Sequence, residues 1–263
     1  MTIFDLLHSS TSDAATPPES GREAVELGRD GHPAAQVALG AYHGDALGRL
    51  ATYRRAFRAA TVTCPAELLG QPGVQDDVRT RGHTVDVHSV DELVFATSLG
   101  IPASRLVLHD DGRTAAPLRC GMNAGVGRIV VGCPARIKVL ASCARRPQRI
   151  LLDVTAGGAD ATVDAVFRCK RLDLIGMHTR LTAAAGVAEY VETVSQMVAQ
   201  MAWTRRHHHV ILTRVSLAGG EVLSRSNPDS DDLRTLTAEL EDAFDDACAR
   251  FRFPRPALIV TLR

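Results

Sequence analysis

Short runs of β-branched and other apolar residues alternate with longer segments of helical periodicity along most of the chain. Gly, Pro or Asp residues bound these segments, as is typical of strands and helices joined by short turns. The pattern predicts eight strands, over 60–64, 83–88, 105–109, 127–131, 149–154, 172–178, 210–217 and 257–261. It predicts helices between them, over 72–81, 90–99, 113–124, 134–145, 160–170, 186–206 and 229–252.

Strands that alternate with helices pair in parallel, because each helix carries the chain back to the start of the next strand. Eight such units favour a closed (β/α)8 TIM barrel over an open doubly wound sheet, which usually has fewer strands. A further helix, predicted over 45–59, would cover the flank between the last strand and the first. Active sites of such barrels lie at the C-terminal ends of the strands, so candidate chemistry is sought there.

The segment before the barrel has a different composition. Residues 8–36 are rich in Ser, Thr, Asp, Pro and Gly and show little periodicity. We therefore expect a flexible N-terminal arm over 1–36, followed by a single barrel domain over 37–263.

The charge balance and the cysteine pattern limit which partners and which cellular compartment are expected. The chain has 30 basic and 30 acidic residues, so neither nucleic acid nor a membrane is an expected partner. Its six cysteines form no CxxC pair, and no window has the length and apolar character of a membrane span or a signal peptide. These features favour a cytoplasmic protein with reduced cysteines.

Five segments carry a resemblance to a known family: Gly82–Leu93, Ile101–His109, Ala124–Val131, Leu174–Arg180 and Val215–Gly220. They resemble motifs of the barrel domain of actinobacterial diaminopimelate decarboxylases. Those enzymes belong, with ornithine and arginine decarboxylases, to the alanine-racemase-like, fold-type-III family that uses pyridoxal phosphate (PLP). The resemblance implies an alanine-racemase-like barrel. It also implies that the C-terminal β domain, which follows the barrel in the family, is absent from this chain.

The chain departs from the family at its chemical positions. The family lysine that forms an imine with PLP corresponds to Glu67, and a carboxylate cannot form a Schiff base. Only Lys138 and Lys170 are available elsewhere, and both fall in predicted helical segments before a strand's C-terminal end. The family histidine that stacks on the cofactor ring corresponds to Arg180. Three further family residues, a serine, an arginine and a glutamate near the cofactor, correspond to Ala183, Asp153 and Thr261.

These departures imply a catalytically degenerate diaminopimelate-decarboxylase-like barrel, a pseudoenzyme with a binding or regulatory role that does not bind PLP covalently. Two alternatives stay open. One is a PLP-dependent amino-acid decarboxylase or other lyase with a displaced or partner-supplied site, which would be a carboxy-lyase acting on a basic or diamino acid. The other is a single-domain PLP-binding protein of the homeostasis type.

The barrel mouth contains several candidate ligand-binding residues. Because Glu67 and Arg180 replace a lysine and a histidine that face one cavity, we predict an ion pair between them; the alternative is that each is solvated separately. Asp86, His109 and His178, with His88 nearby, lie near predicted strand ends. No HxH on the first strand and no HExxH helix accompanies them, so no metal site is predicted.

Anion binding is predicted at Gly219, Gly220 and Arg263, which follow the last two strands. Barrels often bind phosphate at this position through backbone N–H groups. We therefore expect no covalent cofactor, but a phosphate or PLP-like anion held without a covalent bond. The expected partners are a small anionic ligand or a protein such as a homologous decarboxylase. His207–His209 precede the seventh strand and are predicted to form a surface turn at the opposite rim.

Overall fold

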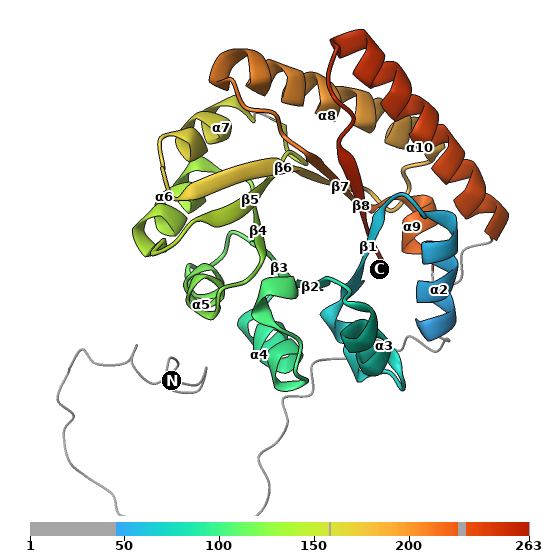
Figure 1. The fold of residues 1–263 in the computed structure, drawn as a ribbon, viewed down its shortest axis with the longest axis horizontal. Helices are drawn as coiled ribbons and strands as arrows, with labels where there is room; N and C mark the ends of the chain where they lie inside the picture. Colours follow the sequence, from blue (N-terminus) through green and yellow to red (C-terminus); the bar gives the residue numbers. More distant parts are fainter. Residues whose placement is uncertain (1–45, 158, 226–229, 263) are drawn as a thin grey trace, which may run out of the picture. The chain divides into compact units, whose positions relative to one another are not determined.

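The computed structural model describes residues 46–157, 159–225 and 230–262, and eight parallel strands in this part close into a barrel (Figure 1). The strands are β1 (Thr61–Pro65), β2 (Val85–Val87), β3 (Leu106–His109), β4 (Arg128–Val131), β5 (Gln148–Asp153), β6 (Leu172–Leu181), β7 (Arg214–Gly219) and β8 (Ala257–Thr261). They follow one another around the barrel in chain order, and β8 pairs with β1. The predicted (β/α)8 barrel is confirmed, whereas the arm predicted over 1–36 lies outside the described residues.

Helices surround the strands and match the predicted segments closely. They are α2 (Ala46–Ala56), α3 (Val74–Arg81), α4 (Val90–Ser98), α5 (Ala116–Ala124), α6 (Pro134–Cys143), α7 (Asp160–Phe167), α8 (Val187–His208), α9 (Glu221–Ser224) and α10 (Ser230–Phe251). Two single 3-10 turns, η1 (Ala66–Gly70) and η2 (Ala103–Arg105), and the short α9 were not predicted. Their sequences are too short for a periodic signal.

Helix α2 covers the flank of β1, as its position before the first strand predicted. Figure 1 shows it in the helical ring between α3 and α10. The buried hydroxyl of Tyr53 on α2 donates a hydrogen bond to the carbonyl of Leu223 on α9, at 3.2 Å. The helix therefore completes the ring beside β8, where no further helix follows within the described residues.

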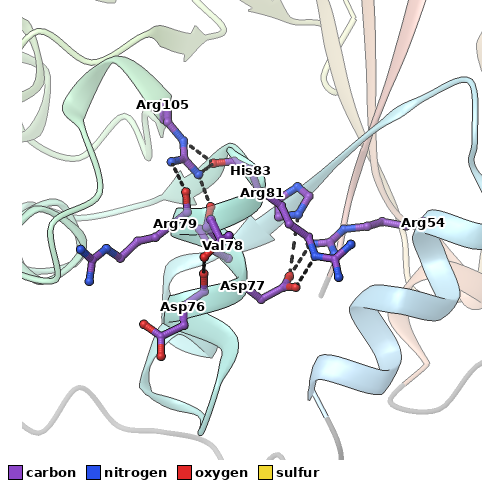
Figure 2. A network of polar contacts seen from close by, with 9 residues as sticks. Arg54, Asp76, Asp77, Val78, Arg79, Arg81, His83 and Arg105 are labelled. Atoms are coloured by element: carbon purple, nitrogen blue, oxygen red, sulfur yellow. Dashed lines mark hydrogen bonds and ion pairs between the residues drawn. The ribbon is translucent and has the colours of Figure 1, made fainter.

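Polar contacts on the N-terminal side hold the first elements together (Figure 2). The Arg105 guanidinium donates hydrogen bonds to the carbonyls of His83, at 2.9 Å, and Val78. These carbonyls lie at the C-terminal end of α3 and in the turn before β2, so one side chain caps the helix and links it to β3. Arg54 on α2 forms an ion pair with Asp77 on α3 at 2.8 Å.

The barrel interior has a layered composition. Strand residues that face outward pack with the helices in one large apolar core, whereas Val107, Val130, Leu151 and Ile259 form a separate small cluster against Ile175. Buried polar side chains lie nearer the mouth on six of the strands: Thr63, Asp86, His109, His178, Ser216 and Thr261. His109 and Thr261 each follow a residue of the small cluster, Val107 and Ile259, by two positions. Because side chains alternate between the two faces of a strand, this pattern identifies the inward-facing set.

An irregularity in β6 changes which of its residues face inward. The pairing of β5 with β6 shifts between Ile150 and Leu151, so that one β6 residue, Ile175, has no partner in the ladder. Such an extra residue inverts the alternation beyond it. Ile175 and His178 therefore both contribute to the interior, although they are three residues apart.

No helix in the described ranges is long and apolar enough to cross a bilayer.

Candidate functional site

A cavity of about 200 Å³ lies at the C-terminal ends of the strands, in the mouth of the barrel. It is lined by Pro65, Glu67, His88, Glu92, Arg180, Ala218, Gly219, Thr261 and Leu262. These residues come from β1, β6, β7 and β8, from η1, from the first turn of α4, and from the residues that directly follow β2 and β8. The cavity occupies the position where (β/α)8 barrels place their chemistry, and four of its side chains are ionisable.

Glu67 and Arg180 line this same cavity, as the sequence predicted, but they do not form the predicted ion pair. The ion pairs found among the described residues include no contact between them. Glu67 lies on η1, beyond the end of β1, whereas Arg180 belongs to β6, which extends to Leu181. Both side chains are half-buried and line the cavity from different elements. The ion-pair prediction was wrong.

Glu92 is a second carboxylate in the cavity. It accepts a hydrogen bond from the backbone N–H of His88 at 2.8 Å, while its own N–H donates to Ser89 Oγ at 3.1 Å, which caps α4. Burial raises the pKa of Glu92, and the nearby charge of Glu67 adds to this rise. The mouth therefore carries two carboxylates, and the guanidinium of Arg180 carries the opposite charge in the same cavity.

A buried acid lies within the barrel close to this cavity. Asp86 Oδ1 accepts a hydrogen bond from Nε2 of His109 at 3.0 Å, and Asp86 also accepts one from the Thr63 hydroxyl. Burial opposes the charge of Asp86, but the hydrogen bond and the charge of His109, with the Thr63 hydrogen bond, prevail and lower its pKa. Thr63 and Thr261 hydroxyls lie 3.2 Å apart and join this network to the cavity wall.

Three imidazoles connect the buried acid to the mouth. The ring of His109 stacks on that of His88, with centroids 4.6 Å apart, and meets the ring of His178 edge-on at 5.0 Å. Nδ1 of His178 is hydrogen-bonded with the Ser216 hydroxyl at 3.0 Å. Burial, and then the charge of His109, lower the pKa of His178 well below its ordinary value, so this ring is neutral near pH 7.

The predicted site residues therefore separate into two groups. Asp86, His109 and His178 come together as predicted, but all three are buried and only His88 among the clustered rings lines the cavity. Their role in ligand binding stays a prediction. No group of His, Cys, Asp and Glu side chains within the described ranges is arranged to hold a metal ion.

The predicted anion site is only partly present at the mouth. Gly219 lines the cavity. Gly220 instead packs against Tyr190, whose hydroxyl would lie 2.0 Å from a Cβ at this position. Arg263 lies outside the described residues. Anion binding at these positions stays a prediction.

Three residues of the network were not singled out from the sequence: Glu92, Thr63 and Ser216. Thr63 and Ser216 occupy inward-facing positions of β1 and β7. If the barrel is assumed, the alternation of side chains along a strand predicts these positions. Glu92 is signalled by the Ser89-x-x-Glu92 spacing, which is typical of a capping box. That spacing predicts a helix start but does not predict that the carboxylate also faces a cavity.

The two lysines and the histidine triplet lie away from the mouth. Lys138 is exposed on α6, and Lys170 is exposed in the turn before β6, because α7 ends at Phe167. His208 lies at the C-terminal end of α8, where Nε2 is 3.1 Å from Asp164. This end of α8 precedes β7, so the triplet lies at the rim opposite the mouth, as predicted. The predicted surface turn is wrong for His207 and His208, which belong to the last turn of α8, and only His209 follows the helix.

Comparison with known proteins places this barrel in a family. Residues 47–260 match the family described as pyridoxal-dependent decarboxylase, pyridoxal binding domain. The diaminopimelate decarboxylase of Actinosynnema pretiosum subsp. auranticum is 28% identical, over 99% of this chain and 68% of the relative. The diaminopimelate decarboxylase of Mycobacterium tuberculosis is 25% identical, over 70% of this chain and 48% of the relative.

Solved structures share the fold. Diaminopimelate decarboxylase from M. jannaschi superposes with a TM-score of 0.68 at 13% identity, over 82% of this chain and 58% of that chain. Lysine/ornithine decarboxylase from Vibrio vulnificus, complexed with cadaverine, superposes with a TM-score of 0.68 at 14% identity, over 82% of this chain and 60% of that one. The chain thus spans between about half and two thirds of the length of these relatives. Since the family match covers most of its length, the chain belongs to the pyridoxal-dependent decarboxylases, as an alanine-racemase-like barrel corresponding to their pyridoxal-binding domain.

Proposed function

We propose that the mouth of this barrel binds a small polar ligand and does not attach PLP covalently, so that the chain is a catalytically degenerate, decarboxylase-like barrel with a binding or regulatory role. One observation carries the proposal. The side chain at the exit of β1 that faces the cavity is Glu67, and the two lysines of the sequence lie elsewhere, exposed on α6 and before β6. An imine requires an amine at the cavity.

The residues at the mouth do not fit a covalently held PLP. Glu67 and Glu92 already place two carboxylates in the cavity, and the raised pKa of Glu92 indicates that further negative charge is unfavourable there. Thr261, at the end of β8, has a hydroxyl that is 3.2 Å from the Thr63 hydroxyl, and it offers no carboxylate.

The charges favour a ligand that carries ammonium groups. Two carboxylates, Glu67 and Glu92, are positioned to accept hydrogen bonds from such groups, and Arg180 is available for a carboxylate of the same ligand. A volume of about 200 Å³ limits the ligand to a small molecule. The diaminopimelate decarboxylase of Helicobacter pylori was solved with L-lysine and the Vibrio vulnificus enzyme with cadaverine. Both ligands carry ammonium groups, and L-lysine also carries a carboxylate. We propose an amino acid or diamine of this class rather than the purely anionic ligand expected from the sequence.

Absorption spectroscopy and mass spectrometry test the covalent part of this proposal. The chain is incubated with PLP and reduced with borohydride, and the adducts are located by peptide mapping. We expect adducts only at exposed Lys138 and Lys170 and at the α-amino terminus, and only at the α-amino terminus in a Lys138→Arg, Lys170→Arg double variant. In that background Glu67→Lys returns an amine to the mouth and serves as the positive control. A reducible imine mapped to any position other than the α-amino terminus, in the double variant that retains Glu67, would contradict the proposal.

Calorimetric titration with L-lysine and cadaverine tests the binding part. We expect Glu67→Gln and Glu92→Gln to weaken binding of both ligands. Arg180→Gln should weaken binding of L-lysine alone, because only L-lysine has a carboxylate. Co-purification with a homologous decarboxylase tests the regulatory role, which requires a protein partner.

A further inference from the structure

A second polar cavity, of about 420 Å³, lies at the N-terminal ends of the strands, at the opposite end of the barrel from the mouth. Three arginines line it: Arg128 at the start of β4, Arg149 near the start of β5 and Arg214 at the start of β7. Asp173, Ser104 and Thr213 complete its polar lining. Its volume falls within the range of about 300–1,000 Å³ that is typical of small-molecule sites.

Strand register brings these arginines together. Each arginine occupies an inward-facing position, because it lies two residues before another inward-facing residue of its strand. Arg128 precedes Val130 and Arg149 precedes Leu151, both of the small apolar cluster, and Arg214 precedes the buried polar residue Ser216. Ile175 packs against the apolar cluster and also lines the cavity. The apolar layer therefore forms the inner end of the cavity and separates it from the mouth.

The positive charge of the cavity is not neutralised by its neighbours. Arg128 donates to the Thr84 hydroxyl at 3.0 Å, and Arg214 donates to the backbone carbonyl of Thr213 at 3.0 Å. Both acceptors are uncharged. The ion pairs of the described residues involve none of the three arginines. With Asp173, the cavity thus holds three guanidinium groups and one carboxylate.

The arginines also repel one another. Burial lowers the pKa of Arg128. The carboxylate of Asp86 opposes this decrease, and the charges of Arg214 and Arg149 add to it. Asp86 itself is paired with His109. An anion that enters the cavity would relieve this repulsion, and its oxygens would replace the water lost by the half-buried guanidinium of Arg128.

We propose that this cavity is a binding site for a small phosphate-bearing anion. Guanidinium groups bind phosphate oxygens through paired, charge-assisted hydrogen bonds, and arginines on three different strands can surround one phosphate group. The hydroxyls of Ser104 and Thr213 provide uncharged donors at the rim. The strands form a rigid frame, so the arginines do not need to be brought together by a mobile loop. This inference is independent of the function proposed for the mouth.

Isothermal titration calorimetry of the full chain with inorganic pyrophosphate tests the site. We expect Arg149→Gln and Arg214→Gln each to weaken binding by about tenfold, the effect of losing one charge-assisted contact. Asp173→Asn removes the only carboxylate in the lining and should tighten binding. Arg119→Gln is the matched control, because Arg119 is exposed on α5 and does not line the cavity. Citrate is titrated in parallel to compare carboxylates with phosphate.

Several results would overturn the proposal. They are the absence of pyrophosphate binding at millimolar concentration, an equal loss of affinity in Arg119→Gln, and tighter binding of citrate than of pyrophosphate. Loss of binding in Arg180→Gln but not in Arg149→Gln would assign the anion to the mouth instead and would also overturn it. Arg149 and Asp173 are exposed, so these two variants decide the question even if Arg214→Gln fails to fold. Thermal unfolding of each variant verifies its folding.

Discussion

The carboxylate of Asp86 on β2 lies 3.0 Å from Nε2 of His109 on β3, inside the barrel. The strand register pairs Asp86 with Val107, so the two side chains meet from positions offset by two residues on adjacent strands. Both are almost inaccessible to solvent. A buried carboxylate without a partner is strongly unfavourable, and the imidazole and the Thr63 hydroxyl stabilise it here.

We predict that Asp86→Asn destabilises the barrel. The amide keeps the shape of the carboxylate but loses the charge-assisted hydrogen bond with His109, so the free energy of unfolding should fall by about 2 kcal/mol. Urea denaturation measures the loss. Asp246→Asn on the exposed face of α10 is the control and should change the free energy of unfolding by less than about 0.5 kcal/mol. An equal effect of both substitutions would show that the buried pair is not stabilising.

Stability should decrease as the pH falls through the range where free histidine takes up a proton. Burial, and then the positive charge of Arg54, lower the pKa of His83 to about 4, while Asp77 acts in the opposite direction (Figure 2). The pKa of buried His178 is lowered as well. Because the unfolded chain binds these protons near the ordinary pKa of 6.5 and the folded chain does not, their stabilising contribution is complete above 6.5 and decreases below it.

Urea denaturation between neutral pH and the folded pKa of His83 measures this decrease. His83→Gln should make the pH dependence shallower, since glutamine does not titrate. His209→Asn, at an exposed position with φ of 58°, is the control, because asparagine tolerates this backbone conformation. If His83→Gln left the slope unchanged, the neutral state of His83 would not contribute to stability.

Gly220 should tolerate no side chain. Its φ of 81° and ψ of 165° lie in a region that is accessible almost only to glycine, and a Cβ would lie 2.0 Å from the Tyr190 hydroxyl. Gly112 also has a positive φ, of 74°, but has open space around its Cβ position. We expect Gly112→Ala to cost about 1 kcal/mol and Gly220→Ala clearly more, by thermal or urea unfolding. Equal costs would mean that the contact with Tyr190 relaxes freely.

Ligand binding at the mouth should depend on pH through Glu92. Burial and the charge of Glu67 raise the pKa of Glu92. Its charged form, which attracts an ammonium group, is therefore lost at a higher pH than for an exposed glutamate. We expect the affinity for cadaverine to fall as the pH decreases through this raised pKa, and Glu92→Gln to bind weakly with a shallower pH dependence. An unchanged pH profile in Glu92→Gln would exclude Glu92 as the titrating group.

Local sequence determined the order and the approximate bounds of the barrel elements. The spacing of apolar residues that predicts a strand or a helix involves only residues close together in sequence. Each strand and each crossover helix can therefore be predicted from its own segment. The same locality explains the errors at element ends. The strand predicted from 210 begins at Arg214, and α7 ends at Phe167 rather than near Lys170.

Closure of the barrel decided which side chains share a site. The resemblance to family motifs placed Glu67 and Arg180 at one cavity. Whether they form an ion pair depends on where η1 positions Glu67 after β1 and on where Arg180 lies along β6, and no local sequence pattern encodes either. The extra residue in β6 likewise decides that His178 faces His109. The three arginines at the N-terminal end lie on β4, β5 and β7, and the register of the closed sheet brings their charges together.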